Sequence, residues 1–263
     1  MLMSDFSITM SAEGFEKTEW LSPAQSLIQI NQCFCHDEKP DAWLRELNFM
    51  SYELQMLSHD QNENEVLATL NSYFFITKKF RPHPLPILLR DVLRERRGCS
   101  ISLAFIYMHL AESVGLNMEL VHWPLHSVLK WCGQGNSRYV DLEFQGKLLS
   151  EDELILLINT HKEKVQVLNL RQAVIQYLSY ISLTYRQAQE YEKLHTSLSM
   201  LLQLEPENTR FLAERALLRK ELGLAKESLN DFKRFFSFIE KQNAPGELLS
   251  AYNHLKSLTD IRL

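Results

Sequence analysis

Residues 100–114 constrain the fold most, because a helix over them is apolar on nearly every side. A helix at a protein surface carries one apolar stripe, whereas a helix that is apolar all round has to be buried. We therefore expect this helix at the centre of a core. Gly115 follows it and is expected to end it as the residue after the C-cap.

Amphipathic helices are predicted ahead of this segment. Apolar residues recur at helical spacing over residues 21–58, and a polar stretch divides them into two helices, the second capped by Asp41. A third helix is predicted over residues 63–75, and a short fourth over 88–97, closed by Gly98. The N-terminal part of the chain is therefore expected to be helical.

The pattern changes to that of β-strands after Gly115. Strands are predicted over residues 118–123, 127–131 and 138–142, with a glycine-rich turn at 133–137 between the last two. Consecutive short strands of this kind pair as antiparallel neighbours. A central helix packed on an antiparallel sheet makes an α+β core.

Helical periodicity returns after the strands. Ser150 and Glu153 predict a capping box at the start of a helix, and beyond that helix only helical periodicity is visible. We expect two domains. Residues 1–165 hold the helical N-terminal part and the α+β core, and residues 166–263 form an all-α region.

A repeat of about 34 residues is predicted in this all-α region, as in tetratricopeptide (TPR) repeats. If Thr209 opens a repeat, its small, Leu-Gly and aromatic positions fall on Ala216, Leu222-Gly223 and Phe232. One period earlier, Ser182 fits the small position, but Gln189 replaces the glycine. The region is therefore TPR-like, and stacked helices of this kind bind peptides or partner helices.

Charge and composition exclude several functions. The chain of 263 residues has 28 Lys and Arg against 33 Asp and Glu, a net charge of -5, which does not favour nucleic-acid binding. Basic residues concentrated at 78–97 are interleaved with acidic ones and are interpreted as a solvated helix face. The start of the chain lacks a secretory signal pattern, and no uncharged stretch is long enough to span a bilayer. Because four cysteines fit reduced thiols, we expect a cytoplasmic protein without membrane association.

Cofactor and metal sites are not predicted. The glycines are too dispersed for a phosphate-binding loop. Cys33, Cys35 and His36 lie close together, but no second pair of ligands follows at the spacing of a zinc site. We therefore expect neither a cofactor nor a metal ion.

Three residues could carry chemistry. Cys99 opens the buried helix, where the helix dipole favours a thiolate, and Arg96 and Arg97 could lower the thiol pKa further. His126 begins a strand and Asp141 lies on the next one. In this arrangement the imidazole can activate the thiol and the carboxylate can orient the imidazole. The order Cys, His, Asp is that of papain-like and transglutaminase-like folds.

The surrounding residues resemble the SirB-type transglutaminase-like family over residues 47–153. The resemblance is carried by Arg97, Gly98, Cys99, Ser102, Leu103, Pro124, His126, Asp141 and Gly146. It implies a transglutaminase-like core followed by TPR repeats. In relatives with a catalytic cysteine, that cysteine stands where this chain has Ser100, and many SirB-type members have proline there. Cys99 is therefore one residue early, and Ser100 is either the nucleophile or, as we favour, the N-cap of the helix.

Two functions remain open. The first is a non-catalytic or weakly catalytic regulatory module that binds a protein or peptide through the TPR-like region. The second is a cysteine hydrolase or acyltransferase of protease or transglutaminase type, with Cys99, His126 and Asp141 as its triad. A shift of one residue turns a helical side chain by about 100°. The position of the Cys99 thiol therefore separates the two functions.

Overall fold

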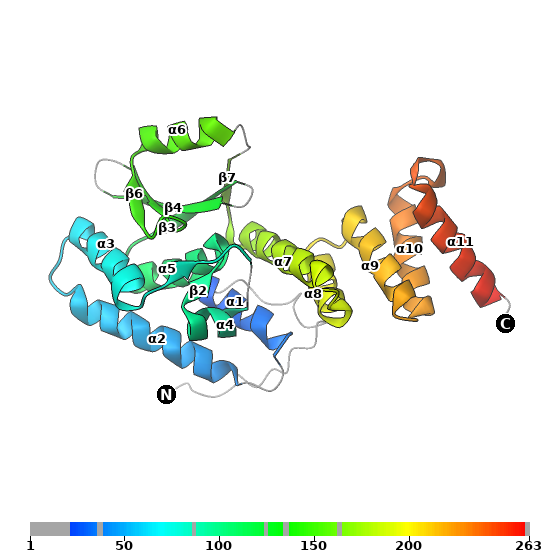
Figure 1. Cartoon of the computed structure of the whole chain (residues 1–263), viewed down its shortest axis with the longest axis horizontal. Helices are drawn as coiled ribbons and strands as arrows, with labels where there is room; N and C mark the ends of the chain where they lie inside the picture. The colour runs from blue at the N-terminus through cyan, green and yellow to red at the C-terminus, as the bar shows by residue number, and fades with distance from the viewer. Residues whose placement is uncertain are drawn as a thin grey trace. The chain divides into compact units, whose positions relative to one another are not determined.

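The computed structural model describes residues 22–35, 39–85, 88–123, 126–133, 137–161 and 165–260 (Figure 1). The chain divides between Tyr177 and Leu178 into two compact units. We call the described residues up to Tyr177 the core unit and those from Leu178 onward the helical unit. The division lies C-terminal of the domain boundary expected from the sequence at residues 165–166.

Helix α5, Ser100–Ser113, lies at the centre of the core unit. Every residue from Ser100 to Tyr107 is buried, and so are Leu110 and Ala111, which confirms the predicted buried helix. The other helices ahead of the sheet are α1, Pro23–Gln32; α2, Pro40–Leu57; α3, Glu63–Ser72, continued by the π-helical turn η2, Tyr73–Thr77; and α4, Leu89–Glu95. Helices α1 and α2 pack directly on α5.

A five-stranded antiparallel sheet packs on α5 through its central strand β4. The strand order is β6-β5-β4-β3-β7. The strands are β3, Met118–Trp123; β4, His126–Cys132; β5, Ser137–Asp141; β6, Lys147–Leu149; and β7, Gln166–Leu168. Helix α6, Glu151–His161, covers the opposite face (Figure 1), where Leu154 packs with Val121 and Val128. The predicted α+β fold is confirmed, while β6 and β7 were not predicted.

Of the two predicted N-terminal helix caps, one is wrong and the other is confirmed. Asp41 is not the N-cap of α2, because Pro40 provides the first helical residue and Lys39 precedes it in an extended conformation. The capping box at α6 is confirmed. The Ser150 N–H donates to the Glu153 carboxylate at 2.8 Å, and the Glu153 N–H donates to the Ser150 hydroxyl at 3.2 Å.

The connection into α5 also differs from the prediction. Helix α4 ends at Glu95 with Arg96 in the left-handed region at φ 55°, so Gly98 does not close it. Gly98 instead pairs with Pro82 in a two-stranded parallel sheet of β1, Arg81–Pro82, and β2, Arg97–Gly98. A Cβ atom on Gly98 would lie 2.5 Å from the Ser102 hydroxyl oxygen. Glycine is therefore needed here for close packing and not as a helix cap.

The helical unit contains the end of α7, Leu170–Gln187, and the helices that follow it. They are α8, Tyr191–Leu204; α9, Thr209–Glu221; α10, Ala225–Phe238; the 3-10 turn η3, Lys241–Asn243; and α11, Gly246–Asp260. The starts of α8 and α10 are 34 residues apart, since 225 − 191 = 34. Gln189, at φ 57°, and Gly223, at φ 75°, are separated by the same interval, 223 − 189 = 34. Two left-handed turns thus recur at one period.

A buried ion network joins three helices of this unit. The Asp231 carboxylate of α10 accepts hydrogen bonds from Arg215 at 2.8 and 2.9 Å and from Arg219 at 2.8 Å. Arg215 also donates to the Ser199 hydroxyl at 3.2 Å, and Arg219 to the His195 imidazole at 3.1 Å. Both arginines belong to α9, while Ser199 and His195 belong to α8. The network therefore fixes α9 between its neighbours.

Candidate functional site

Cys99 lies just outside α5. Its backbone is extended, with φ −66° and ψ 159°, and it occupies the N-cap position without forming a side-chain cap. Ser100 is the first helical residue. The preferred prediction that Ser100 caps the helix is therefore wrong, because pairing of Arg97 and Gly98 in β2 keeps the chain extended through Cys99.

The Cys99 thiol is directed into the first turn of its own helix. The side chain is buried, and its sulfur lies 3.5 Å from the Ser102 hydroxyl, which in turn donates to the Cys99 carbonyl at 2.9 Å. Burial raises the pKa of the Cys99 thiol, although hydrogen bonds with Ser102 and the Ile101 backbone act in the opposite direction. A reactive cysteine has a lowered pKa. The surroundings of Cys99 are those of a structural thiol.

The two arginines expected to activate this thiol do not do so. Arg96 pairs with Glu46 at 2.7 Å and lies over the ring of Phe80, 5.1 Å from its centroid. Arg97 is exposed. Neither arginine is among the groups that shift the pKa of Cys99, and burial raises that pKa.

His126 and Asp141 come together as the sequence order predicts. The His126 Nε2 atom lies 3.1 Å from Asp141 Oδ1, at the point where β4 begins and β5 ends. Asp141 is 1% exposed, and the same Oδ1 accepts the backbone N–H groups of Glu143 at 3.0 Å and Phe144 at 3.2 Å. The Asp141 carboxylate therefore orients the imidazole and also stabilises the turn after β5.

Glu143 is a site residue that the sequence analysis missed. Its side chain is half-buried, and Ser100 and the His126 charge both act to lower its pKa. Burial nevertheless raises the pKa of Glu143, with the neighbouring Asp141 charge adding to the effect. The only signal in the sequence is an acidic residue two positions after Asp141. It becomes meaningful once the turn after β5 is known to face α5.

A cavity of about 430 Å³ lies beside the His126–Asp141 pair. It is lined by Asp141, Phe144, Lys147, Leu149, Glu153, Leu156 and Leu157. Phe144 and Leu156 are largely exposed at its rim, and the Phe144 ring centroid lies 6.5 Å from that of His126. The volume is in the range of small-molecule pockets. A bound apolar group would therefore contact Phe144 and Asp141, whereas His126 does not line the cavity.

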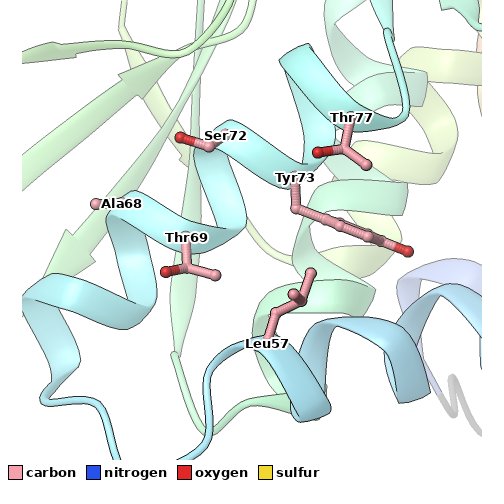
Figure 2. A pocket seen from close by; sticks show the side chains of 6 residues that line it. All are labelled: Leu57, Ala68, Thr69, Ser72, Tyr73 and Thr77. Carbon is pink, nitrogen blue, oxygen red and sulfur yellow. The ribbon is translucent and has the colours of Figure 1, made fainter.

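A second cavity, of about 290 Å³, lies away from these residues (Figure 2). Figure 2 shows Leu57, at the end of α2, facing Thr69 and Tyr73 of the α3–η2 segment. Its lining of apolar and hydroxyl side chains offers no carboxylate, imidazole or thiol. We assign it no chemistry.

The remaining motif residues are mostly packing residues. Ser102 and Leu103 are fully buried in α5. Gly146 has φ +81°, and its carbonyl accepts the Asn71 amide at 2.6 Å. Pro124 lies outside the described residues. Ser102, Leu103 and Gly146 therefore support the backbone around the site.

His122 forms a separate buried pair. Its Nδ1 atom lies 2.7 Å from the Ser127 hydroxyl on the neighbouring strand. Burial lowers the pKa of His122 to about 4. The imidazole is therefore neutral at physiological pH.

Two absences apply to the residues that the structure describes. In these ranges no group of three His, Cys, Asp or Glu side chains is arranged to hold a metal ion. Over the same residues, no helix combines the length and the apolar character needed to cross a bilayer.

Comparisons with known proteins agree with this geometry. A family model described as transglutaminase-like superfamily matches residues 41–189. F-box only protein 21 from Pongo abelii is 26% identical over 213 residues, covering 74% of this chain and 34% of that protein, and the Homo sapiens protein is 26% identical over 197 residues, 68% and 31%. A UPF0162 protein from Xylella fastidiosa is 24% identical over 195 residues, 70% of this chain and 64% of that protein.

These matches have clear limits. The chain spans about a third of the length of these F-box only proteins, 34% of the Pongo abelii protein and 31% of the Homo sapiens protein. No solved structure is significantly similar to the chain. The family model nevertheless covers more than half of the 263 residues, including α5 and the strands that carry His126 and Asp141. The chain therefore belongs to the transglutaminase-like superfamily.

Proposed function

We propose that this protein is a non-catalytic, SirB-type transglutaminase-like protein that binds a protein partner through its TPR-like helices. One observation carries the proposal. The only cysteine at the start of α5, Cys99, is buried against Ser102 and its pKa is raised. A nucleophilic cysteine requires the opposite environment, with access to substrate and a stabilised thiolate.

The SirB-type assignment rests on the motif and on one relative. The UPF0162 protein aligns with 70% of this chain, so its likeness extends over most of the length and supports a shared architecture. Ser100 stands at the nucleophile position, where many SirB-type members have proline. A position that tolerates proline in the family is a poor place for an obligatory nucleophile.

The TPR-like assignment rests on the recurring geometry of the helical unit. Helices α8 and α10 start 34 residues apart, 225 − 191 = 34, which is the length of a TPR. The turns before them repeat as well, because Gln189 adopts the left-handed conformation that Gly223 adopts one period later. We infer one regular repeat, α9 with α10, and a less regular one before it.

A cysteine hydrolase or acyltransferase is the second candidate. It is favoured by the 3.1 Å contact between His126 and Asp141 and by the cavity beside them. In that function the Cys99 sulfur would attack an acyl carbon and form a thioester, while His126 took up the thiol proton and passed it to the leaving group.

Alkylation of Cys99 by iodoacetamide, followed by peptide mass spectrometry, separates the two. For a non-catalytic protein we expect native Cys99 to react at least about tenfold more slowly than glutathione near neutral pH. His126→Ala should leave the rate within about twofold, because the imidazole does not activate the thiol. A Cys99 that reacts faster than glutathione and is slowed by both His126→Ala and Asp141→Ala would establish the enzyme instead.

Partner binding is tested with the immobilised full chain. We expect proteins captured from a cytoplasmic extract of the source cell to cross-link to exposed lysines of the helical unit, such as Lys226 and Lys233. Cross-links confined to core-unit lysines such as Lys147 would contradict a TPR-like binding surface. The cytoplasm is proposed as the source because Cys33 and Cys99 form no disulfide.

A further inference from the structure

The cavity of about 430 Å³ lies where one edge of the five-stranded sheet meets α6. The edge strand β6 contributes Lys147 and Leu149 to its lining, and α6 contributes Glu153, Leu156 and Leu157. The rest of the lining comes from the end of β5 and the turn after it. The cavity is therefore a feature of the core unit, and a ligand in it goes beyond the TPR-like surface of the proposed function.

One oxygen of the Asp141 carboxylate is left for a ligand in this cavity. The Oδ1 atom lies 3.1 Å from His126 Nε2 and accepts the backbone N–H groups of Glu143 and Phe144. Within the described part of the chain, the Oδ2 atom has no hydrogen-bond partner, although the side chain is only 2% exposed and lines the cavity. A buried polar atom without a partner is costly. A hydrogen-bond donor bound in the cavity would remove that cost.

The charges around the cavity favour a cationic donor. Asp141 and Glu153 supply two carboxylates to the lining, against the single ammonium group of Lys147. Helix α6 adds two more acidic residues, Glu151 and Asp152, in the same first turn as Glu153. Glu153 and Lys147 are both exposed and largely offset each other in water, whereas the charge of the buried Asp141 is screened less. An anionic ligand is therefore disfavoured.

The apolar part of the lining selects the kind of cation. It consists of Phe144, Leu149, Leu156 and Leu157. An ammonium group is compact and strongly hydrated, whereas a guanidinium group is planar, more weakly hydrated and able to stack on an aromatic ring. Phe144 offers such a ring, because it is 63% exposed at the rim. The lining therefore suits a guanidinium group better than an ammonium group.

We propose that this cavity binds the guanidinium group of an arginine side chain that belongs to a partner polypeptide. Asp141 Oδ2 accepts its hydrogen bond, and the ring of Phe144 stacks on its plane. A polypeptide is favoured over a free small cation because the apolar surface continues at the rim, where Leu156 is 68% exposed. Apolar residues next to the arginine would pack on this rim. The binding requires no chemistry at Cys99 and no contact with the helical unit.

An NMR titration of the isotopically labelled full chain with short peptides tests the site. Acetyl-Leu-Arg-Leu-amide should bind with a Kd of about 1 mM and shift the amide resonances of Phe144, Leu149 and Leu157. The citrulline counterpart has the same shape without the charge and should bind at least about fivefold more weakly. The lysine counterpart should bind at least about threefold more weakly. Acetyl-arginine methylamide, which lacks the leucines, should bind at least about twofold more weakly.

Substitutions at the cavity assign the binding to it. Asp141→Asn should weaken binding of the arginine peptide at least about fivefold, because the acceptor loses its charge. Phe144→Ala should weaken it about threefold through the lost stacking surface. Lys147→Gln removes the opposing charge and should tighten binding about twofold. Phe144 and Lys147 are exposed, so their variants decide the question if Asp141→Asn does not fold.

A matched pair of capping-box carboxylates provides the control. Glu153 accepts the Ser150 N–H at 2.8 Å at the start of α6, and Glu65 accepts the Asn62 N–H at 3.0 Å at the start of α3. Glutamine keeps this acceptor in both places and removes the charge. Glu153→Gln should weaken binding of the arginine peptide about twofold, whereas Glu65→Gln should leave it unchanged.

Equal binding of the arginine and citrulline peptides overturns the proposed site. So does the absence of shifts at the cavity residues in about 10 mM arginine peptide, and so does an affinity that neither Phe144→Ala nor Lys147→Gln changes. Equal binding of acetyl-arginine methylamide overturns the polypeptide as the source of the guanidinium group. None of these outcomes depends on the alkylation of Cys99, so failure of this site and failure of the proposed function are distinguishable.

Discussion

Burial keeps several ionisable side chains of the core unit in their neutral forms. It raises the pKa of Cys33 to about 11, raises that of Cys99 and lowers that of His122 to about 4. In each case, burial removes more solvation free energy from the charged form than interactions with neighbouring groups restore. These three residues of the core unit are therefore neutral packing residues, which agrees with a site that does not activate a nucleophile.

The stability of the protein should depend on pH through His122. Its pKa is about 4 in the folded protein against an ordinary value of 6.5. As the pH falls from 6.5 toward 4, the unfolded chain binds a proton that the folded one does not, so the free energy of unfolding decreases. Over the whole range from pH 6.5 to 4, the free energy of unfolding should decrease by about 3 kcal/mol. Urea unfolding measured across this range should show this decrease.

The control for this dependence is His122→Asn, which keeps a polar partner for the Ser127 hydroxyl but does not titrate. Its unfolding free energy should fall less over the same pH range. The exposed His59 provides the matched comparison, and His59→Asn should retain the wild-type slope. Equal slopes in the wild type and His122→Asn would show that other groups carry the pH dependence.

Asp141 should contribute more to stability than His126. Its Oδ1 accepts two backbone N–H groups as well as the imidazole. Asp141→Ala leaves these part-buried donors without their acceptor and should cost about 2–4 kcal/mol in urea unfolding. Asp141→Asn keeps the oxygen and should cost less. His126→Ala should cost about 1 kcal/mol or less, because the imidazole is partly exposed. Equal losses in the two alanine variants would contradict the turn-shaping task of Asp141.

At the scale of elements, the turn between β5 and β6 fixes the site against α3. Gly146 has φ +81°, and an added Cβ would lie 2.0 Å from Asn71 Oδ1 and 2.6 Å from the Phe75 ring. Gly115 has nearly the same backbone, φ +80°, but no atom within 4 Å of an added Cβ. The two glycines therefore share a backbone conformation, but only Gly146 has neighbouring atoms that would overlap with a side chain.

Alanine substitutions at these two glycines should separate the cost of the left-handed backbone from the cost of steric overlap. Gly115→Ala meets only the left-handed backbone and should cost about 1 kcal/mol in urea unfolding. Gly146→Ala adds an overlap with Asn71 and should cost about 3 kcal/mol or more. Similar losses in both variants would mean that the turn moves away from α3 without penalty.

The elements that were predicted correctly have strong patterns of their own. The apolar run of α5 and the three longer strands are readable from the sequence. Strands β6 and β7 have only three residues each. A period of two residues cannot be recognised over such a length, and these strands exist because β5 and β3 offer pairing edges.

The candidate site was predictable in part for the same reason. The order of His126 and Asp141 on successive strands implies that they meet, and they do. The influence of Ser100 on the pKa of Glu143 depends on the turn after β5, which no local pattern encodes. The orientation of the Cys99 thiol depends on the β2 pairing of Arg97 and Gly98. These features of the site depend on contacts between segments far apart in the sequence, so local sequence patterns could not predict them.

At the scale of the whole molecule, the two units are stabilised by different means. The core unit is centred on the apolar α5, with ten buried residues in that helix, whereas the helical unit also encloses the charged Asp231 network. Side chains of Arg215 and Arg219 are only 10% and 16% exposed. Charges buried to this degree stabilise a fold only while they remain paired.

Removing Asp231 should therefore unfold the helical unit first. Asp231→Ala leaves Arg215 and Arg219 buried without their carboxylate and should cost about 3–5 kcal/mol. Hydrogen exchange with mass spectrometry should show lost protection in α8, α9 and α10, because all partners of the network lie in these helices. Glu214→Ala, which removes a more exposed partner of Arg186, should cost less than about 1 kcal/mol. Equal loss of protection throughout the core unit would mean that the two units unfold as one.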